Sequence, residues 1–326
     1  MSEHQLLVVY PGSGTFYQEL ARRFFTACKE ELQEVALCSS RELRSMTADR
    51  LGSATLAVVN PVECAATSND RPGWCAATRS DRLEFFSKLA FGYKRIMVLA
   101  EAVESDWYKR QFRVPVAFDA LFDIGFVSQK EKHPFPDVSY CFVFDGPTKK
   151  EERVIAALSP SKRCIPWALV GYQNPDHLNL VAALVDYGLY PGGFCYLQRP
   201  WHMGNPMHRG GQRKAQLGPT GLTAVLSKTS YYVWSSDDHY STPDDSFAYY
   251  ESFRFIQALL AGAVPCKIQG KHSLDKPDIP GIFTSAQSFC AKMQEEDYWS
   301  MYSSAREFYT SKGSLAEHLE KALRFV

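Results

Sequence analysis

Short apolar runs alternate with segments of helical periodicity along the first half of the chain. Leu6–Tyr10 is an apolar run typical of a buried strand, and apolar side chains then recur every fourth residue from Phe16 to Leu32, which predicts an amphipathic helix. The alternation continues with predicted strands at 35–38, 56–60, 95–100, 122–128 and 140–144 and predicted helices at 80–91 and 149–158. Strands separated by helices pair in parallel through right-handed crossovers, so we expect an open, doubly wound sheet.

The pattern restarts after a polar, proline-containing stretch at 159–163. It predicts strands at 164–170, 194–198, 230–235 and 264–268, helices at 177–186, 221–228 and 247–261, and two or three further helices from 285 to 325. We therefore predict an α/β protein of two Rossmann-like domains, residues 1–158 and 159–326, with a C-terminal helical tail.

Residues with special roles mark several of the predicted helix ends. Ser80 or Asp81 is the expected N-cap of the helix at 80–91, and Asp176 that of the helix at 177–186. Gly188 and Gly262 are expected to stop the helices that precede them. The last helix, from Ser314, is expected to cross back onto the first domain.

The composition is that of a globular protein and excludes several classes. Of the 326 residues 45% are hydrophobic and 22% are charged, unlike a disordered chain or a coiled coil. The 36 Lys and Arg balance the 36 Asp and Glu, so we expect no nucleic-acid partner, which would need a basic surplus. Nine scattered cysteines without a C-x-x-C pair predict reduced thiols and no zinc site. The lack of a long apolar run or signal peptide predicts a cytoplasmic protein without a transmembrane segment.

The first loop lies where open α/β sheets bind ligands. Gly12, Ser13 and Gly14 follow the first predicted strand and precede the first helix, as part of a dinucleotide fingerprint. Tyr17 stands at the third glycine position, so the close helix–strand approach of that fingerprint is lost. A nicotinamide site, a plain turn and a loop that contacts another substrate all remain open from these residues.

The stretch Tyr249–Ile268 carries the most specific pattern. Its apolar positions predict a helix, a glycine stop and a buried strand. It also resembles the donor-binding motif S-x-R-x-x-E-A-L-x-x-G-x-x-P-V of GT-B glycosyltransferases, above all the exostosin-type and "glycosyltransferase group 1" families. The matching residues are Ser252, Arg254, Ala258, Leu259, Gly262 and Pro265. The resemblance implies two Rossmann-like domains facing across a cleft, with a nucleoside-diphosphate sugar bound by the second domain and the acceptor by the first.

The helix in this stretch suits a diphosphate. A helix N-terminus offers free N–H groups to an anion, and Arg254 and Ser252 add side-chain donors near Gly171. We therefore expect the leaving group to be stabilised without a metal or another cofactor. The family usually has Glu where this chain has Gln257, whose amide oxygen can still accept hydrogen bonds from the donor ribose. Tyr249, and not Glu251, stands at the first position of the E-x7-E motif of retaining members; Glu251 stays in the predicted donor set.

Two further segments bear on the donor site. The irregular stretch 199–220 is rich in glycine and contains six basic or histidine side chains, namely Arg199, His202, His208, Arg209, Arg213 and Lys214. A loop of this length is often functional, so it either closes over the donor phosphates, with Arg199 as a contact, or is a solvated insertion. Asp237-Asp238-His239 is similar to the acidic metal motif of the other glycosyltransferase architecture, and we interpret it as a solvated loop.

The first domain is expected to bind a glycan, lipid or small-molecule acceptor near Gly12, Ser13 and Gly14. An inverting transferase needs a general base for the acceptor hydroxyl, and Glu101, after the strand ending at Ala100, is the first candidate. His133, in a proline-rich loop, is the second. Two alternatives stay open: a nicotinamide-dependent oxidoreductase or epimerase, because of the first loop, and a non-catalytic nucleotide-sugar-binding relative, because of Gln257.

Overall fold

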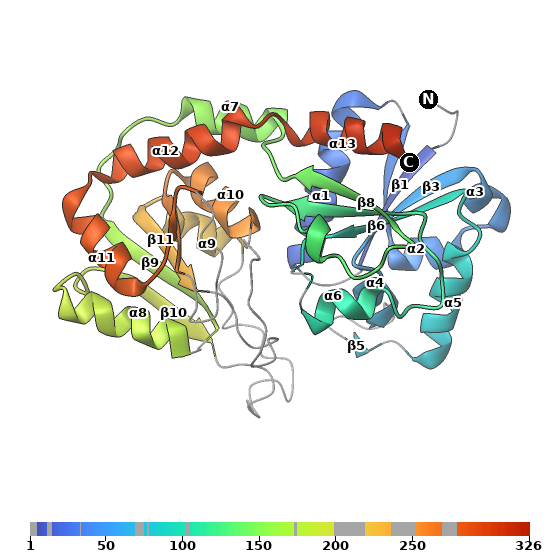
Figure 1. Ribbon diagram of the computed structural model, residues 1–326, viewed down its shortest axis with the longest axis horizontal. Helices are drawn as coiled ribbons and strands as arrows, with labels where there is room; N and C mark the ends of the chain where they lie inside the picture. Colours follow the sequence, from blue (N-terminus) through green and yellow to red (C-terminus); the bar gives the residue numbers. More distant parts are fainter. Residues whose placement is uncertain are drawn as a thin grey trace. The chain divides into compact units, whose positions relative to one another are not determined.

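The computed structural model describes residues 5–11, 15–32, 34–68, 75–76, 78–101, 103, 105–172, 175–198, 219–235, 252–268 and 279–326. The chain forms two compact α/β units (Figure 1). The first comprises Met1–Lys150, Tyr249–Phe253 and Lys312–Val326, and the second comprises Glu151–Ala248 and Arg254–Ser311. The C-terminal helix thus belongs to the first unit, whereas the predicted domain ranges were 1–158 and 159–326.

In the described part of the first unit, parallel strands form a six-stranded sheet in the order β2-β1-β3-β6-β7-β8. They are β1 (Gln5–Tyr10), β2 (Val35–Ser39), β3 (Ala54–Val59), β6 (Lys94–Leu99), β7 (Ala120–Gly125) and β8 (Ser139–Phe144). The order reverses between β1 and β3, because β2 lies on one side of β1 and β3 on the other. Open α/β sheets bind ligands at such a switch point, outside the carboxyl ends of the strands.

Helices cover both faces of this sheet, which explains why its strands are mostly apolar on both faces. Leu6 and Val8 of β1 pack in one core with α1 (Thr15–Glu31) and α13 (Leu315–Phe325). Leu7 and Val9 pack in the other. The helices beyond that second core are α2 (Ser40–Ser45), α3 (Ala48–Gly52), α4 (Pro61–Ala66), α5 (Arg79–Leu89) and α6 (Asp106–Gln111). Two smaller elements are the antiparallel pair β4 (Thr67–Ser68) with β5 (Cys75–Ala76) and the 3-10 helix η1 (Lys130–Lys132).

The C-terminal helix α13 returns to the first unit, as the sequence predicted. It lies against α1 and β8 (Figure 1), and Ser314 caps it by accepting from the Glu317 N–H at 3.3 Å. The Leu315 N–H donates to the Pro147 carbonyl at 3.0 Å. Arg23 of α1 forms a buried ion pair with Asp145 at 2.5 Å. The two ends of the chain segment that forms the second unit are therefore anchored on α1 and β8.

The second unit has a five-stranded sheet in its described part, in the order β10-β9-β11-β12-β13. Its strands are β9 (Ile165–Tyr172), β10 (Phe194–Gln198), β11 (Thr229–Ser235), β12 (Val264–Ile268) and β13 (Ile282–Phe283). Its helices are α8 (Pro175–Asp186), α9 (Pro219–Leu226), α10 (Ser252–Ala261), α11 (Ala286–Glu295) and α12 (Tyr298–Ser311), and α7 (Lys149–Ala157) leads into it. Here the strand order reverses between β9 and β11.

Local features test the predicted helix ends. Gly188 and Gly262 adopt left-handed φ values of 68° and 75° after α8 and α10, as predicted. The predicted cap of α5 is wrong: Thr78 is the N-cap, and Asp81 is its partner in a reciprocal capping box. Asp176 is also not a cap, because α8 already begins at Pro175.

Two further features concern the apolar character of the helices and the state of the cysteines. No helix in them is long and apolar enough to cross a membrane. The cysteines they contain are free thiols, most of them buried.

Candidate functional site

Gly171 and Arg254, both predicted to bind the donor, come together at the carboxyl end of β9. Gly171 is the second-last residue of β9, and Arg254 is the third residue of α10. The Arg254 Nη1 donates to the Val170 carbonyl at 2.8 Å, and a Cβ added at Gly171 would lie 3.5 Å from that nitrogen. This is an ordinary van der Waals distance, so the guanidinium group packs directly against Gly171 beside the switch point of the second sheet.

His177 of α8 completes this arrangement and was missed in the sequence. It is fully buried, and its Nε2 accepts from the Ser235 N–H, at the end of β11, at 3.1 Å. Because Nε2 accepts, the ring is neutral with its proton on Nδ1. A Cβ at Gly171 would lie 3.2 Å from the His177 Cε1. The imidazole thus joins the ends of β9 and β11. In the sequence, only its place shortly after a predicted strand could have indicated this role.

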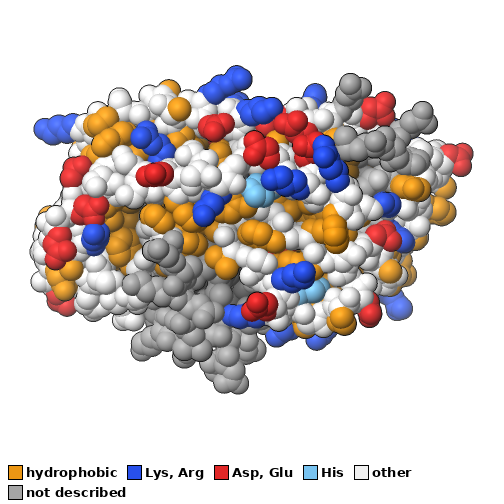
Figure 2. Space-filling model, turned by 45° about the horizontal axis from the view of Figure 1, so that its top comes forward, with side chains coloured by type: hydrophobic (Ala, Val, Ile, Leu, Met, Phe, Trp, Pro, Cys, Tyr) orange, Lys and Arg blue, Asp and Glu red, His pale blue; other side chains and the backbone are white. Residues whose placement is uncertain are grey.

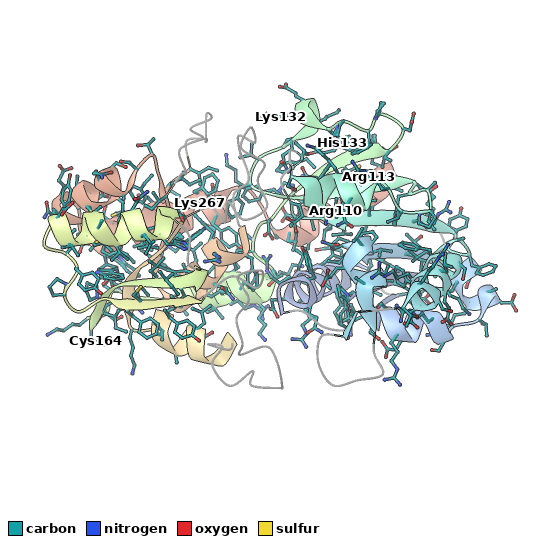
Figure 3. All side chains as sticks on the ribbon, turned by 90° about the horizontal axis from the view of Figure 1, so that it is seen from below. Arg110, Arg113, Lys132, His133, Cys164 and Lys267 are labelled. Atoms are coloured by element: carbon teal, nitrogen blue, oxygen red, sulfur yellow. The ribbon has the colours of Figure 1, made fainter. Side chains whose placement is uncertain are left out.

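A second cation lies at the end of β12. Lys267, labelled in Figure 3, is 4% exposed. Its register partner is Trp234 of the neighbouring strand β11. Lysine is rarely this buried unless its side chain is paired, and Lys267 does have an interaction partner. The apolar pattern of Val264–Ile268 predicted the strand and gave no weight to this side chain. Lys267 adds positive charge near the carboxyl edge of the second sheet.

The other predicted donor residues are placed only in part. Ser252 begins α10, although its side chain lies outside the described residues, and Gln257 is a half-buried residue one turn after Arg254. Arg199 and Glu251 lie outside the described residues, as do the motif 237–239 and the basic segment 199–218.

In the first unit, Glu101 lies just beyond β6 and is held at two points. Its Oε1 accepts from the Tyr17 hydroxyl of α1 at 2.6 Å. Its carbonyl accepts from the Gln129 Nε2 at 3.0 Å, and the Gln129 Oε1 accepts from the Val103 N–H at 2.9 Å. The half-buried carboxylate therefore lies on a loop that the buried Gln129 holds on both sides.

A buried carboxyl group supports Gln129 in turn. Asp123 of β7 is 1% exposed, lies 3.2 Å from the Gln129 Nε2, and accepts from the Tyr140 hydroxyl of β8. Burial raises the pKa of Asp123 to about 7, although the hydrogen bonds from Tyr140 and Gln129 lower it. A network of buried polar groups thus fixes the Glu101 loop from behind.

His133, the second predicted base, lies in an aromatic cluster. Its Nδ1 is 2.8 Å from the Tyr108 hydroxyl, and its ring centroid is 5.2 Å from that of Tyr140. Burial lowers the pKa of the imidazole. A chain of contacts through Tyr140, Asp123 and Gln129 links it to the main chain of Glu101. The exposed Arg110, Arg113 and Lys132 lie on the same part of the unit (Figure 3).

The end of β3 holds polar groups that sequence analysis did not single out. Asn60 is 1% exposed and adopts a left-handed φ of 49°, which Asn tolerates better than most residues. Its Oδ1 accepts from the Glu63 N–H at 3.1 Å, while its buried Nδ2 has no hydrogen-bond partner among the described residues. Glu63 of α4 is 5% exposed, and burial raises the pKa of its carboxyl group to about 7.

The buried Glu63 carboxyl group gives a prediction for stability. Because its pKa in the folded chain is higher than the usual 4.5, it stabilises the fold at low pH, and that contribution is lost as the pH rises through about 7. Glu63→Gln is therefore expected to match the wild type near pH 5 and to be more stable near pH 8, by about 2–3 kcal/mol. Denaturant unfolding at the two pH values measures this, and equal stability at both would contradict it.

The remaining predicted contacts lie at the first loop. Gly12, Ser13 and Gly14 are outside the described residues, so their predicted contact with the acceptor stays a prediction. In the ranges that are described, no group of three or more His, Cys, Asp or Glu side chains is arranged to hold a metal ion.

Comparison with known proteins identifies a shared fold. No family model matches the chain, and no curated protein matches it. A solved structure of the DNA-modifying enzyme β-glucosyltransferase, studied with and without its substrate uridine diphosphoglucose, is similar at a TM-score of 0.53 and 11% identity. The similarity covers 98% of this chain and 99% of that one. The chain thus has the GT-B fold, with two Rossmann-like units, that the sequence predicted.

Proposed function

We propose that this protein is a glycosyltransferase that moves a sugar from a nucleoside-diphosphate sugar to a hydroxyl group of an acceptor. The observation that carries the proposal is the meeting of Gly171 and the Arg254 guanidinium at the switch point of the second sheet. The similar enzyme uses uridine diphosphoglucose, so a UDP-sugar is the first donor to test.

The donor diphosphate would bind at the beginning of α10. Backbone N–H groups in the first turn of a helix point toward its N-terminus, and together with the positive end of the helix dipole they favour an anion there. Arg254 adds a charge-assisted contact, and Lys267, on a strand of the same sheet, adds a second positive charge. These groups would stabilise the leaving diphosphate by themselves, and we therefore propose a reaction that needs no metal.

The acceptor would bind at the carboxyl edge of the first sheet, where Glu101 serves as the general base. Its carboxylate takes the proton of the acceptor hydroxyl while that oxygen forms a bond to the anomeric carbon of the donor sugar. The bond from the anomeric carbon to the diphosphate breaks, and its electron pair leaves with the diphosphate. Tyr17 and Gln129 orient Glu101 for this inverting reaction.

A glycan, lipid or small molecule fits the acceptor role better than DNA, which the similar enzyme modifies. The formal net charge of the chain is zero. On the face that Figure 2 shows, basic and acidic side chains are interspersed, without a stripe of one sign across the described residues. Binding to a phosphate backbone relies on such a basic stripe.

A ligand panel tests the proposal. Thermal unfolding is measured with UDP, GDP, dTDP, ADP, CMP and NAD, each in large excess. A nucleotide present at about 100 times its dissociation constant stabilises the folded protein by about 2.7 kcal/mol. We expect that shift with UDP or another nucleoside diphosphate. A shift with NAD alone would replace the proposal with an oxidoreductase, and no shift with any nucleotide would remove its donor site.

A further inference from the structure

We propose that Asn60 and Glu63 form a subsite that binds two neighbouring hydroxyl groups of a carbohydrate acceptor. The inference deepens the proposed function and rests on it, because it names the class of acceptor. Its evidence comes from the end of β3 and the beginning of α4 in the first unit, whereas Gly171, Arg254 and Lys267 belong to the second unit.

The first observation is a capping box of which only one half is formed. At α2, α5 and α11 the N-cap side chain accepts from the third helical N–H, and the third side chain accepts from the N-cap N–H. Asn60 and Glu63 have the same spacing, and the Asn60 Oδ1 does accept from the Glu63 N–H. The Asn60 N–H, however, donates to the Val98 carbonyl of β6 at 3.1 Å. The Asn60 N–H group, which would otherwise donate to the Glu63 carboxylate, is therefore hydrogen-bonded within the sheet.

Two complementary polar groups are consequently left without protein partners. The Asn60 Nδ2 is fully buried and has no hydrogen-bond partner among the described residues. The Glu63 carboxylate makes no hydrogen bond or ion pair with them either, although its oxygens are not among the fully buried atoms. Buried polar groups in native proteins are nearly always hydrogen-bonded, so the Asn60 amide requires an explanation.

A pair of neighbouring hydroxyl groups satisfies both. One hydroxyl oxygen accepts from the Asn60 amide, and the next hydroxyl donates to the Glu63 carboxylate, because each hydroxyl is both a donor and an acceptor. Carbohydrates carry such pairs on adjacent ring carbons. Simple alcohols and most lipid tails do not.

The position agrees with a substrate role. Asn60 follows β3 directly, at the switch point between β1 and β3 where sheets of this type bind ligands. The neighbouring strand β6 leads to Glu101, the proposed base. The buried Gln111 of α6 accepts from the Val62 N–H at 3.0 Å and so fixes the first turn of α4. The pair is therefore held in place before any ligand arrives.

Two conservative variants separate a binding role from a structural one. Asn60→Asp keeps the oxygen that accepts from the Glu63 N–H and tolerates the left-handed φ, but it removes the amide donor. Glu63→Gln keeps the shape of the side chain and removes its charge. Asp119→Asn is the matched control, because Asp119 precedes β7 at the opposite edge of the same sheet and accepts from the Arg95 N–H at 2.8 Å.

The experiment is saturation-transfer NMR on the full chain with methyl glucoside, methyl galactoside and 9-methylguanine as probes. 9-Methylguanine is included because a guanine edge also pairs with an amide donor and a carboxylate, and it carries no sugar hydroxyl groups. We expect a methyl glycoside to bind the wild type and the Asp119→Asn control equally, and to bind Asn60→Asp and Glu63→Gln at least tenfold more weakly. Near pH 8, Glu63→Gln should be more stable than the wild type and yet bind the glycoside more weakly. If Glu63 had only a structural role, weaker binding would come with a less stable fold.

Three results would overturn the subsite: unchanged glycoside binding in both variants, no glycoside binding to the wild type, or binding of 9-methylguanine in place of the glycosides. UDP-induced stabilisation is measured on the same samples. All four proteins should respond to UDP alike, because Asn60 and Glu63 lie outside the donor site. If UDP does not stabilise the wild type, the result counts against the proposed function. If glycoside binding is unchanged in the variants, the result counts against the subsite alone.

Discussion

Arg254→Ala is expected to lower kcat/KM for sugar transfer from a UDP-sugar by about 100- to 1,000-fold and to abolish stabilisation by UDP. Loss of one preorganised donor to a charge that develops in the transition state typically has an effect of about this size. The Arg254 side chain is the cation in the first turn of α10, beside Gly171. Steady-state transfer assays and thermal unfolding with UDP measure the two effects.

The controls for this variant separate charge from geometry. Arg254→Lys keeps the positive charge but loses the forked guanidinium, so its activity should fall between those of the wild type and Arg254→Ala. Arg153→Ala removes an exposed arginine of α7 and should behave like the wild type. Because Arg254 also donates to the Val170 carbonyl, unfolding without ligand must show that the variant still folds. Unchanged UDP binding by a folded Arg254→Ala would contradict the assigned donor site.

Much of the fold follows from the local sequence. The apolar runs at β1, β3 and β6 are buried on both faces, so their pattern alone identified them as strands of a parallel sheet. Helices as long as α1 show several turns of periodicity, whereas α4 and α6 have six residues each and too few turns for a pattern. Element length therefore decided which parts could be predicted.

Candidate residues of the site could be predicted only where their pattern lies within one continuous stretch of sequence. Arg254 was identified because the motif around it is contiguous in the sequence. The network of Asp123, Gln129 and Tyr140 depends on strand register and a loop, and it reaches Glu101 from 28 residues away. The unpartnered Glu63 carboxylate depends on a hydrogen bond between Asn60 and Val98 of another strand. No local sequence pattern predicts which backbone N–H group will donate to a neighbouring strand of the sheet.

Glu101→Gln is expected to lower kcat for transfer by about 100- to 10,000-fold, the contribution that a general base makes, with UDP binding unchanged. The substitution is selective because Gln keeps an oxygen that can accept from the Tyr17 hydroxyl, and Gln129 binds only the main chain at this position. Glu84→Gln, at an exposed position on α5 of the same unit, is the matched control and should leave transfer unchanged.

Comparing sugar transfer with UDP binding distinguishes a catalytic role of Glu101 from a structural one. If Glu101 only supported the loop, its replacement would weaken acceptor binding and raise KM while kcat changed little. If it removes the acceptor proton, kcat falls while UDP stabilises the variant as it does the wild type. Normal transfer by Glu101→Gln would exclude it as the base. Because Glu63 also lies at the carboxyl edge of this sheet, Glu63→Gln is then measured in the same assay with varied acceptor. A lower kcat assigns the proton to the buried Glu63 carboxyl group, whereas a raised KM with unchanged kcat agrees with acceptor binding alone.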